Sequence, residues 1–523
     1  MANKNLFATI AGKLAPNTDA VNQAGGLAYA LTPKQALAQY AATGCLNRTF
    51  YASAEKQLET VLSLCASVDD LFIARTAIYC RERGFMKDMP ALLCAVLATR
   101  NAALLESIFP RVIDNGKMLR NFVQIVRSGV TGRKSLGTAP KRMIRRWLDN
   151  ASHDALFRAS VGQSPSLADV IRMVHPKPDD KAREALYGYL IGRPHDVEKL
   201  PALVMEYEAF KRGATSTVPD VPFQMLTSLE LDTAAWTAIA RNAPWQMTRM
   251  NLNTFARHGV FANEEVTKLI AARLADPDAV RKARVFPYHL LSAFLAAGDG
   301  VPLIVRDALQ DAMEIATQNV PAIDGKVYVC ADVSGSMHAA ATGARGTATS
   351  AVRCIDVAAL VAASRLRKNP SAEVLPFDTK LVSVDVNARD SVMTNARKLA
   401  AIGGGGTACS VPLEKLNKRN AYGELVIYVS DNESWADPER GRGTKMMKEW
   451  NAFKHRNPNA RLVCIDVQPN RTTQAIERED VLNVGGFSDA VFTLTAEFAA
   501  GRLGAGHWTE VIENVALAES AVA

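Results

Sequence analysis

Apolar positions up to about residue 320 recur with the period of an amphipathic α-helix. In SPSLADVIRMV they fall at i, i+3, i+4 and i+7 from Leu167 onward, which puts them on one face. Ser164 suits the N-cap of this helix and Pro165 its first helical position. No segment of this part shows convincing strand alternation, and short stretches with Pro, Gly and Asp separate the helices. Although no strict repeat of fixed length occurs, the pattern predicts a stacked helix-pair solenoid.

The pattern changes at about Ile323. Short apolar runs rich in β-branched residues (KVYVCAD, AEVLPFD, LVSVDV, ELVIYVSD and RLVCIDV) now alternate with helical segments. This alternation predicts a parallel sheet with helices on both faces. The run LVSVDV follows the strand before it too closely for a crossover helix, so we expect one antiparallel edge strand. With a boundary at NVPAIDGK, residues 319–326, the chain divides into residues 1–322 and residues 323–523.

Length and composition limit the class of protein. A chain of 523 residues is too long for a single hydrophobic core. No apolar stretch reaches the roughly 18 residues of a membrane helix, and the first residues lack the apolar segment of a secretory signal. The eight cysteines are scattered and form no CxxC pair, as expected of buried thiols in a reducing compartment. Together these features predict a cytoplasmic protein with no membrane partner.

Positive charge is concentrated in one segment. Ten basic residues and a single acidic one, Asp114, lie between Arg111 and Trp147. This surplus of nine exceeds the net charge of +8 of the whole chain, so the remainder is close to neutral. A local surplus of this kind is typical of a surface that binds polyanions. The basic residues are Arg111, Lys117, Arg120, Arg127, Arg133, Lys134, Lys141, Arg142, Arg145 and Arg146.

The stretch APKRMIRRWLDN predicts an amphipathic helix with one apolar and one basic face. A row of Lys and Arg side chains on a helix can neutralise the phosphates of a nucleic acid. A solvated face and a helix lying on a membrane surface remain alternatives, although the basic, glycine-containing stretch TGRKSLGTAPK favours nucleic acid. The apolar face consists of Met143, Ile144, Trp147 and Leu148, and the basic face of Arg142, Arg145 and Arg146 with Lys141 at its edge.

Aspartates lie at the ends of predicted strands: Asp332 follows VYVCA, and Asp431 follows LVIYVS. In open parallel sheets, ligands bind outside the carboxyl ends of the strands. Ser334 and Ser336 come shortly after the first aspartate, and Thr407 follows the glycine loop AIGGGG between the two strands. Two carboxylates and three hydroxyls are hard oxygen donors, which a small octahedral cation such as Mg²⁺ prefers. Because the hydroxyls add no charge, the metal could still bind an outside carboxylate or phosphate.

Other sites with similar residues fit less well. The loop GGGGTACS lacks the Lys-Ser/Thr pair of a P-loop. An aspartyl-phosphate phosphatase needs a second acid at the position of Ser334, and a serine hydrolase needs a base, a role in which nothing places His338. The residues of DVSGS alone are also common in turns and helix caps. The order of strand, glycine loop, threonine and second strand-end aspartate favours the metal site.

The succession DVSGS, GGT, SD resembles the metal-ion-dependent adhesion site of the von Willebrand factor A domain, over about residues 325–500. The resemblance implies a Rossmann-like α/β domain that binds a divalent metal, Mg²⁺ by preference, with Ca²⁺ or Mn²⁺ as alternatives. It implies ligand binding through the metal and no catalysis. The implied metal ligands, some of them through water, are Asp332, Ser334, Ser336, Thr407 and Asp431.

The helical part resembles the TROVE module of the Ro ribonucleoprotein family in NQAGGLAYALTPKQALAQYAATGCLNRTFYAS, GRKSLGTAPKRMIRRW, SPSLADVIRMVHPKP and ARVFPYHLLSAFLAA. That family joins this module to a C-terminal A-type domain, so the resemblance covers nearly the whole chain. It implies an α solenoid of HEAT-like helical repeats, closed into a monomeric ring with the A domain. Where the family often has Arg-Ile-His-Pro-Phe this chain has RVFPY, with Phe286 replacing the histidine, and RMNLN departs from the usual spacing. These departures suggest a bacterial ortholog.

The resemblance also implies a role in RNA quality control. Small structured Y RNAs would bind the outer basic surface, and single-stranded 3′ ends of misfolded or immature RNAs would enter the central hole. Bacterial relatives are linked to 3′-to-5′ exoribonucleases in RNA maturation and decay, including that of rRNA. The outer contacts would be Lys134, Lys141, Arg142, Arg145, Arg146, His175 and Lys177, and the inner contacts Arg249, Asn251, Arg284 and His289.

Two other functions are compatible with the same residues. The chain could be a protein-adhesion scaffold whose metal site grips an acidic residue of a partner, but the local basic surplus argues against this as its sole role. It could be a metal-dependent phosphohydrolase or nuclease, but no second acid suits the role of a base, and one hydroxyl-rich site fits two-metal cleavage poorly. A non-catalytic RNA-binding ring is therefore the preferred hypothesis.

Overall fold

The computed structural model describes residues 16–43, 46, 48–178, 180–283, 285, 287–341, 352–437, 443–503 and 506–517. These residues form two compact units. We call the one that contains residues 69–274 and 297–306, with the segment from 515 on, the helical unit. The other, the sheet unit, contains residues up to 68, 275–296 and 307–514. The division expected at residues 322/323 remains a prediction, and the packing groups the first described residues with the sheet.

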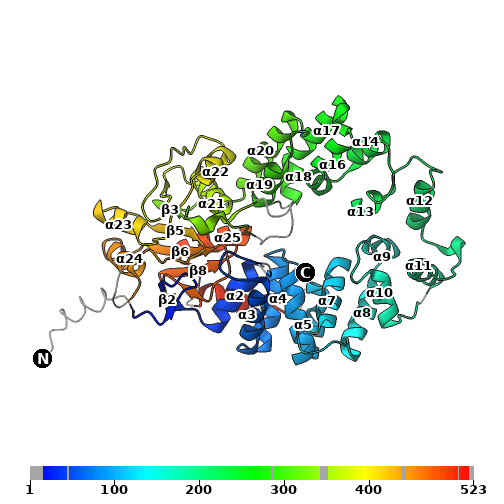
Figure 1. Ribbon diagram of the computed structural model, residues 1–523, viewed down its shortest axis with the longest axis horizontal. Helices are drawn as coiled ribbons and strands as arrows, with labels where there is room; N and C mark the ends of the chain where they lie inside the picture. Colours follow the sequence, from blue (N-terminus) through cyan, green and yellow to red (C-terminus); the bar gives the residue numbers. More distant parts are fainter. Residues whose placement is uncertain are drawn as a thin grey trace. The chain divides into compact units, whose positions relative to one another are not determined.

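The helical unit confirms the expectation of successive short amphipathic helices (Figure 1). Helix α4 packs on α5 and α6, α5 also on α7, and α6 on α8, so each helix contacts its near neighbours in the chain. Helix α5 is buried from Met89 to Ala98 because its sequence is apolar on all sides. The elements are α4 (Asp70–Glu82), α5 (Asp88–Arg100), α6 (Ala102–Val112), α7 (Gly116–Ser128), α8 (Thr138–Asn150), α9 (His153–Ala159), α10 (Leu167–Val174), α11 (Lys181–Ile191), η1 (Val197–Lys199), α12 (Ala202–Lys211), α13 (Phe223–Leu226), α14 (Thr233–Asn242), α15 (Trp245–Met250), α16 (Leu252–Arg257), η2 (Val260–Ala262) and α17 (Glu264–Leu274).

The start of α10 differs from the prediction. The helix begins at Leu167 and its N-cap is Ser166, whereas Ser164 and Pro165 lie before it. The Ser166 hydroxyl accepts a hydrogen bond from the Asp169 N–H, and the Asp169 carboxylate accepts one from the Ser166 N–H. This reciprocal capping box satisfies two backbone donors, which explains why the later serine begins the helix. The predicted apolar stripe is correct, since Leu167, Val170, Ile171 and Val174 are all buried.

The sheet unit contains the predicted parallel sheet. Five strands lie in the order β4-β3-β5-β6-β8, and every pair is parallel. Strands β3 and β5 are buried along their whole length, as expected of a sheet covered on both faces. The strands of this sheet are β3 (Val327–Ala331), β4 (Glu373–Val374), β5 (Leu425–Ser430), β6 (Arg461–Asp466) and β8 (Val481–Gly485).

Helices cover both faces of this sheet (Figure 1). On one face lie α21 and α25, with α22 packed on α21, and α23 packs with α24 against the other face. The helices of the sheet unit are α2 (Pro33–Thr43), α3 (Ala54–Ala66), α18 (Pro277–Ala283), α19 (Pro287–Ala296), most of α20 (Leu303–Thr317), η3 (Gly335–His338), α21 (Cys354–Lys368), α22 (Val392–Ala400), α23 (Val411–Lys418), α24 (Lys445–Arg456), α25 (Asp489–Ala499) and α26 (His507–Glu513).

The expected antiparallel edge strand is wrong. Residue Leu381 forms a single antiparallel bridge with Phe377, and the rest of LVSVDV has no strand partner among the described residues. Two further differences involve short strands. Strands β1 (Ala20–Val21) and β2 (Leu27–Ala30) lie in the part expected to be helical, and β2 pairs with β7 (Thr472–Thr473) in a separate antiparallel sheet.

None of the helices that the structure describes combines the length and the apolar character that a membrane crossing needs.

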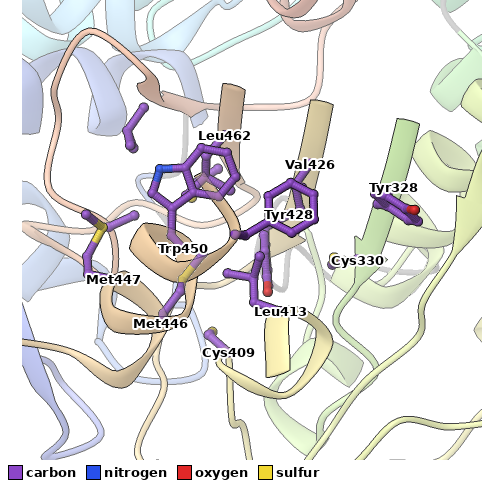
Figure 2. Packing of buried hydrophobic residues seen from close by; sticks show 14 of the residues in the cluster. Tyr328, Cys330, Cys409, Leu413, Val426, Tyr428, Met446, Met447, Trp450 and Leu462 are labelled. Carbon is purple, nitrogen blue, oxygen red and sulfur yellow. The ribbon is translucent and has the colours of Figure 1, made fainter. Parts of the chain in front are cut away.

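The core of the sheet unit lies between the sheet and helices α23 and α24. Figure 2 shows Trp450, Met446 and Met447 of α24 packed beside Tyr428 of β5 and Leu413 of α23. The Trp450 indole is fully buried, stacks on Phe453 at 5.8 Å and donates a hydrogen bond to Asp480 Oδ2 at 2.8 Å. It therefore combines apolar burial with a satisfied polar atom, so few substitutions could replace it.

We expect Trp450→Ala to lower the free energy of unfolding by about 3–5 kcal/mol, because it leaves a large cavity in the core and removes one of the hydrogen bonds to the Asp480 carboxylate. Urea denaturation followed by circular dichroism measures this change. Trp435→Ala is the matched control: that indole is 54% exposed, so its loss should change stability little. Equal effects of the two substitutions would contradict the assignment of the core.

Candidate functional site

The two strand-end aspartates lie at the carboxyl ends of adjacent strands. Ala331, the last residue of β3, is paired with Val429 of β5, and the Asp332 N–H continues the ladder by donating to Val429 O at 3.0 Å. Asp431 follows the last residue of β5 directly. Both side chains are buried, at 0% and 1% exposure. Parallel pairing in this register therefore brings the two carboxylates to the same edge of the sheet.

The three predicted hydroxyl donors belong to the loops at this edge. The Ser334 N–H donates to Asp332 Oδ1 at 2.8 Å, and the Ser334 and Ser336 hydroxyl oxygens lie 3.4 Å apart. Ser336 also hydrogen-bonds to Asp431. The glycine loop before Thr407 reaches the same turn, because the Gly335 N–H donates to Gly405 O at 2.9 Å. All five predicted donors are buried, and the structure brings them to one end of the sheet.

The electrostatics of this end are unfavourable for two free carboxylates. Burial, and then the negative charge of Asp431, raise the pKa of Asp332 to about 7, although hydrogen bonds from Ser334 and Ser430 oppose the rise. Burial also raises the pKa of Asp431. Its Oδ2 atom is buried and has no hydrogen-bond partner among the described residues. None of the basic side chains that the structure describes forms an ion pair with Asp332 or Asp431.

A divalent cation fits these residues. It would neutralise both carboxylates and give the unpartnered Asp431 oxygen a partner, which together would offset the desolvation described above. The remaining donors are neutral hydroxyls, so the set suits a hard cation that retains water or an outside anion. Among the described residues, no group of three or more His, Cys, Asp or Glu side chains could hold a metal. A metal at this edge would therefore depend on the hydroxyls.

Sequence reasoning missed residues that support the site. The Ser430 hydroxyl donates to Asp332 Oδ2 at 2.5 Å, and burial raises the pKa of Glu433 to about 7. Asp378 accepts a hydrogen bond from the Gly405 N–H at 3.2 Å and so holds the glycine loop. Ser430 and Glu433 flank Asp431 in the stretch VSDNES, which is a signal visible in the sequence. Asp378 ends the apolar run AEVLPFD, which is the same strand-end signal, but its contact with Gly405 joins residues that are 27 positions apart.

The glycine loop is tightly packed at one position. A Cβ atom on Gly404 would lie 1.9 Å from Val333 O and 2.6 Å from Ser334 Cα, which no real contact allows. A Cβ atom on Gly403 would meet nothing within 4 Å. The glycine loop can therefore pack against the DVSGS turn because Gly404 has no side chain.

We expect Gly404→Ala to lower the free energy of unfolding by about 1–3 kcal/mol, since the loop must move away from Val333. Gly403→Ala is the matched control and should change stability by less than about 1 kcal/mol. Chemical denaturation of both variants measures the difference. Similar values for the two alanines would show that the loop does not pack on the turn as described.

The basic segment forms a second candidate site, in the helical unit. Lys141 and Arg145 are one turn apart on α8 and line an open pocket of ≈ 630 Å³ together with Lys134 and Arg127. The lining contains four basic residues and no acidic one. We call these four residues the basic pocket. Arg127 was not among the predicted contacts.

His175 and Lys177 follow shortly after Val174, whose carbonyl contacts a residue of the basic pocket. The Arg145 guanidinium donates to the carbonyl of Val174, the residue before His175. His175 ends α10 in the left-handed conformation, with φ 50°, and its side chain is exposed, as is that of Lys177. The predicted contacts Lys134, Lys141, Arg145 and His175 are therefore neighbours in the structure.

Arg142 and Arg146 belong to a different surface. They line a second pocket, of ≈ 510 Å³, on another side of α8, with Trp147 and Met143. The Arg142 guanidinium pairs with Glu106 at 2.7 Å. The single basic face expected for this helix is thus divided into two stripes, because residues one apart point about 100° away from each other.

Some of the concentrated positive charge supports the fold. Arg111 pairs with Glu82 at 2.7 Å, and Arg133 donates to the carbonyls of Ala98 and Ser135. Burial lowers the pKa of Arg120, which donates to Gly116 O within α7. The surplus available to a ligand is therefore smaller than the sequence count.

The predicted inner contacts are less exposed than the outer ones. Arg249 donates to Gln246 Oε1, and burial lowers the pKa of its guanidinium to about 10. Asn251 donates to Met247 O at 2.8 Å at the junction of α15 and α16. His289 belongs to α19 of the sheet unit, where its ring meets that of Tyr288. Arg284 lies outside the described residues.

A long run of packed helices and an A-type α/β sheet with a hydroxyl-rich strand end together define a class of two-part binding proteins. The family model of the Ro60 vWA domain matches residues 326–499, and that of the TROVE domain matches residues 217–300. The chain therefore contains a Ro60-type vWA domain and a TROVE domain, as the sequence resemblance predicted.

Individual relatives agree. The curated RNA-binding protein RO60 of Deinococcus radiodurans is 26% identical over 548 aligned residues, which cover 96% of this chain and all of that protein. RNA-binding protein RO60 of Caenorhabditis elegans is 22% identical over 246 residues, 45% of this chain and 37% of that protein. The crystal structure of the D. radiodurans RO (RSR) protein has the same fold, with a TM-score of 0.61 at 21% identity, and covers 90% of this chain and all of the other.

Proposed function

We propose that this protein binds structured RNA through the basic pocket on α8. The observation that carries the proposal is its lining, which has four basic side chains and no acidic one. Lys and Arg contacts to phosphates supply affinity without reading sequence, as expected for duplex RNA, whose base edges are poorly accessible. The relatives that match the chain bear the name RNA-binding protein, which supports the same conclusion.

The proposal extends to the RNAs and partners that the family resemblance implies. Small Y-type RNAs are the ligand of the basic pocket, with His175 and Lys177 beside it. Single-stranded 3′ ends of misfolded or precursor RNAs, including rRNA, enter the hole of a monomeric ring in which Arg249, Asn251, Arg284 and His289 are contacts. The protein works in the cytoplasm with a 3′-to-5′ exoribonuclease, which carries out the cleavage.

The strand-end site has a binding role in this proposal. Asp332, Ser334, Ser336, Thr407 and Asp431 hold a divalent cation, Mg²⁺ by preference, and the cation supplies a positive point that attracts an anionic group of a partner. The surrounding residues position these ligands: Ser430 orients Asp332, and Asp378 holds the glycine loop. We assign no catalysis to the site, in keeping with the binding role that the family resemblance implies.

Replacing Lys134, Lys141 and Arg145 together by alanine should weaken binding of a small RNA hairpin and flatten its dependence on salt. Each lost phosphate contact lowers the slope of log K against log[salt] by up to about 1. Fluorescence anisotropy at several salt concentrations measures both quantities. A variant with Lys211, Arg241 and Lys268 replaced by alanine removes the same charge elsewhere in the helical unit and should bind nearly as the parent protein does.

Unchanged affinity and slope in the first variant would refute the assignment of the basic pocket. If protein capture also returned only proteins, with or without ribonuclease treatment, the protein-adhesion scaffold would replace RNA binding as the function.

Titration calorimetry with MgCl₂ should show binding to the parent protein and none to Asp332→Asn, because the variant removes one of two charged ligands. Thr407→Val, which keeps the shape and removes a neutral donor, should bind about tenfold more weakly. Thermal melts without metal confirm that each variant is folded. Equal Mg²⁺ affinity in all three proteins would exclude this edge of the sheet as the metal site.

A further inference from the structure

The second pocket on α8 has no role in the binding of structured RNA proposed above. It lies between α6, the start of α7, α8 and α9 and has a volume of ≈ 510 Å³. That volume is within the range of roughly 300–1,000 Å³ found for pockets that hold small molecules. Its wall is apolar and partly aromatic, with Phe109 from α6 and Met143 and Trp147 from α8.

Three side chains of α8 face this pocket without partners in the protein. Arg146 and Trp147 are adjacent, and Asn150 lies one turn beyond Arg146. In the part of the chain that the structure describes, none of the three makes a hydrogen bond, an ion pair or a ring contact. A guanidinium, an indole and an amide are therefore all available to a ligand at one place.

The acidic residues of the lining do not cancel this positive charge. Glu106 pairs with Arg142 at 2.7 Å, and Asp114 pairs with Arg81 at 2.6 Å. After these two ion pairs, Arg146 is the charge of the lining that remains uncompensated. The pocket thus offers an apolar wall with a single cation at its edge, which suits an anionic aromatic ligand.

The walls of the pocket are held by the core of the helical unit. Phe109 is buried and packs edge-to-face on Phe122 at 5.3 Å, and Met143 is 4% exposed. Gly116, at the start of α7, lies so close to α9 that an added Cβ would meet Ala159 Cβ at 2.4 Å. These contacts fix the helices that surround the pocket, so it exists before a ligand arrives.

We propose that this pocket takes one unpaired nucleotide of the RNA that is bound at the basic pocket. The base packs against Trp147, the Asn150 amide meets its polar edge, and Arg146 binds the adjoining phosphate. The proposal rests on the proposed function, and it adds recognition of a base to recognition of phosphates. Continuity favours RNA as the occupant, because both pockets are on the same helix and an RNA that crosses α8 passes between them.

The test uses two RNAs with the same phosphates. One is a hairpin with four unpaired adenylates at each end, and the other is the same hairpin with these eight positions abasic. For the parent protein we expect the abasic RNA to bind about tenfold more weakly. For Trp147→Ala and Trp147→Leu the two RNAs should bind equally, whereas Trp147→Phe should retain part of the difference because it keeps a ring. Anisotropy titrations measure all affinities, and thermal melts establish that each variant is folded.

The outcomes separate the two proposals. The nucleotide pocket is refuted if removal of the bases lowers the affinity of Trp147→Leu as much as that of the parent protein. It is also refuted if removal of the bases leaves the affinity of the parent protein unchanged. In both cases RNA binding itself stands. If neither RNA binds the parent protein, the proposed function itself fails. If alanines at Lys134, Lys141 and Arg145 weaken both RNAs alike while the tenfold difference persists, the two pockets act separately and both proposals are supported.

Discussion

Parallel pairing of β3 with β5 places two aspartates side by side where water is excluded. The ladder that joins Ala331 to Val429 determines how close Asp332 and Asp431 come, so their separation is a property of the backbone rather than of flexible side chains. Two such groups are tolerated only with a proton or a cation between them, because burial disfavours their ionised forms. The surrounding residues follow from this constraint: Ser334 and Ser336 of the DVSGS turn and Ser430 at the end of β5 all donate hydrogen bonds to the carboxylates.

Helix α8 shows how one element can serve a core and two surfaces. Its buried stripe of Met143, Ile144 and Leu148 fixes the rotation of the helix about its axis. With that rotation fixed, Lys141 and Arg145 must leave the helix on one side and Arg142 and Arg146 on another. Basic residues that look like a single cluster in the sequence are therefore separated by geometry into two environments, one purely basic and one bordered by Trp147 and by acidic partners.

The fold could be predicted in its larger features because these depend on local patterns. Apolar runs such as VYVCA predict a strand that is covered on both sides, and the position of Asp332 directly after that run indicates where the strand ends. The same reasoning failed for LVSVDV, where alternation exists without a partner strand, and for LAYA, whose two partners pair with it in an antiparallel ribbon. The five candidate metal donors were identifiable from their order, whereas Asp378 and the separation of Arg142 from Arg145 depend on residues distant in sequence.

Strand β2 has a consequence for how the chain is made. The carbonyl of Leu27, the first residue of this strand, accepts a hydrogen bond from Gln474, 447 residues later. During synthesis at about 5–20 residues per second, the first described segment waits roughly 20–90 s before its partner leaves the ribosome. Until then Tyr29, which is 1% exposed in the finished protein, has no core to enter. The sheet unit is therefore completed after translation of nearly the whole chain, and its opening segment depends on chaperones or on its own solubility in the meantime.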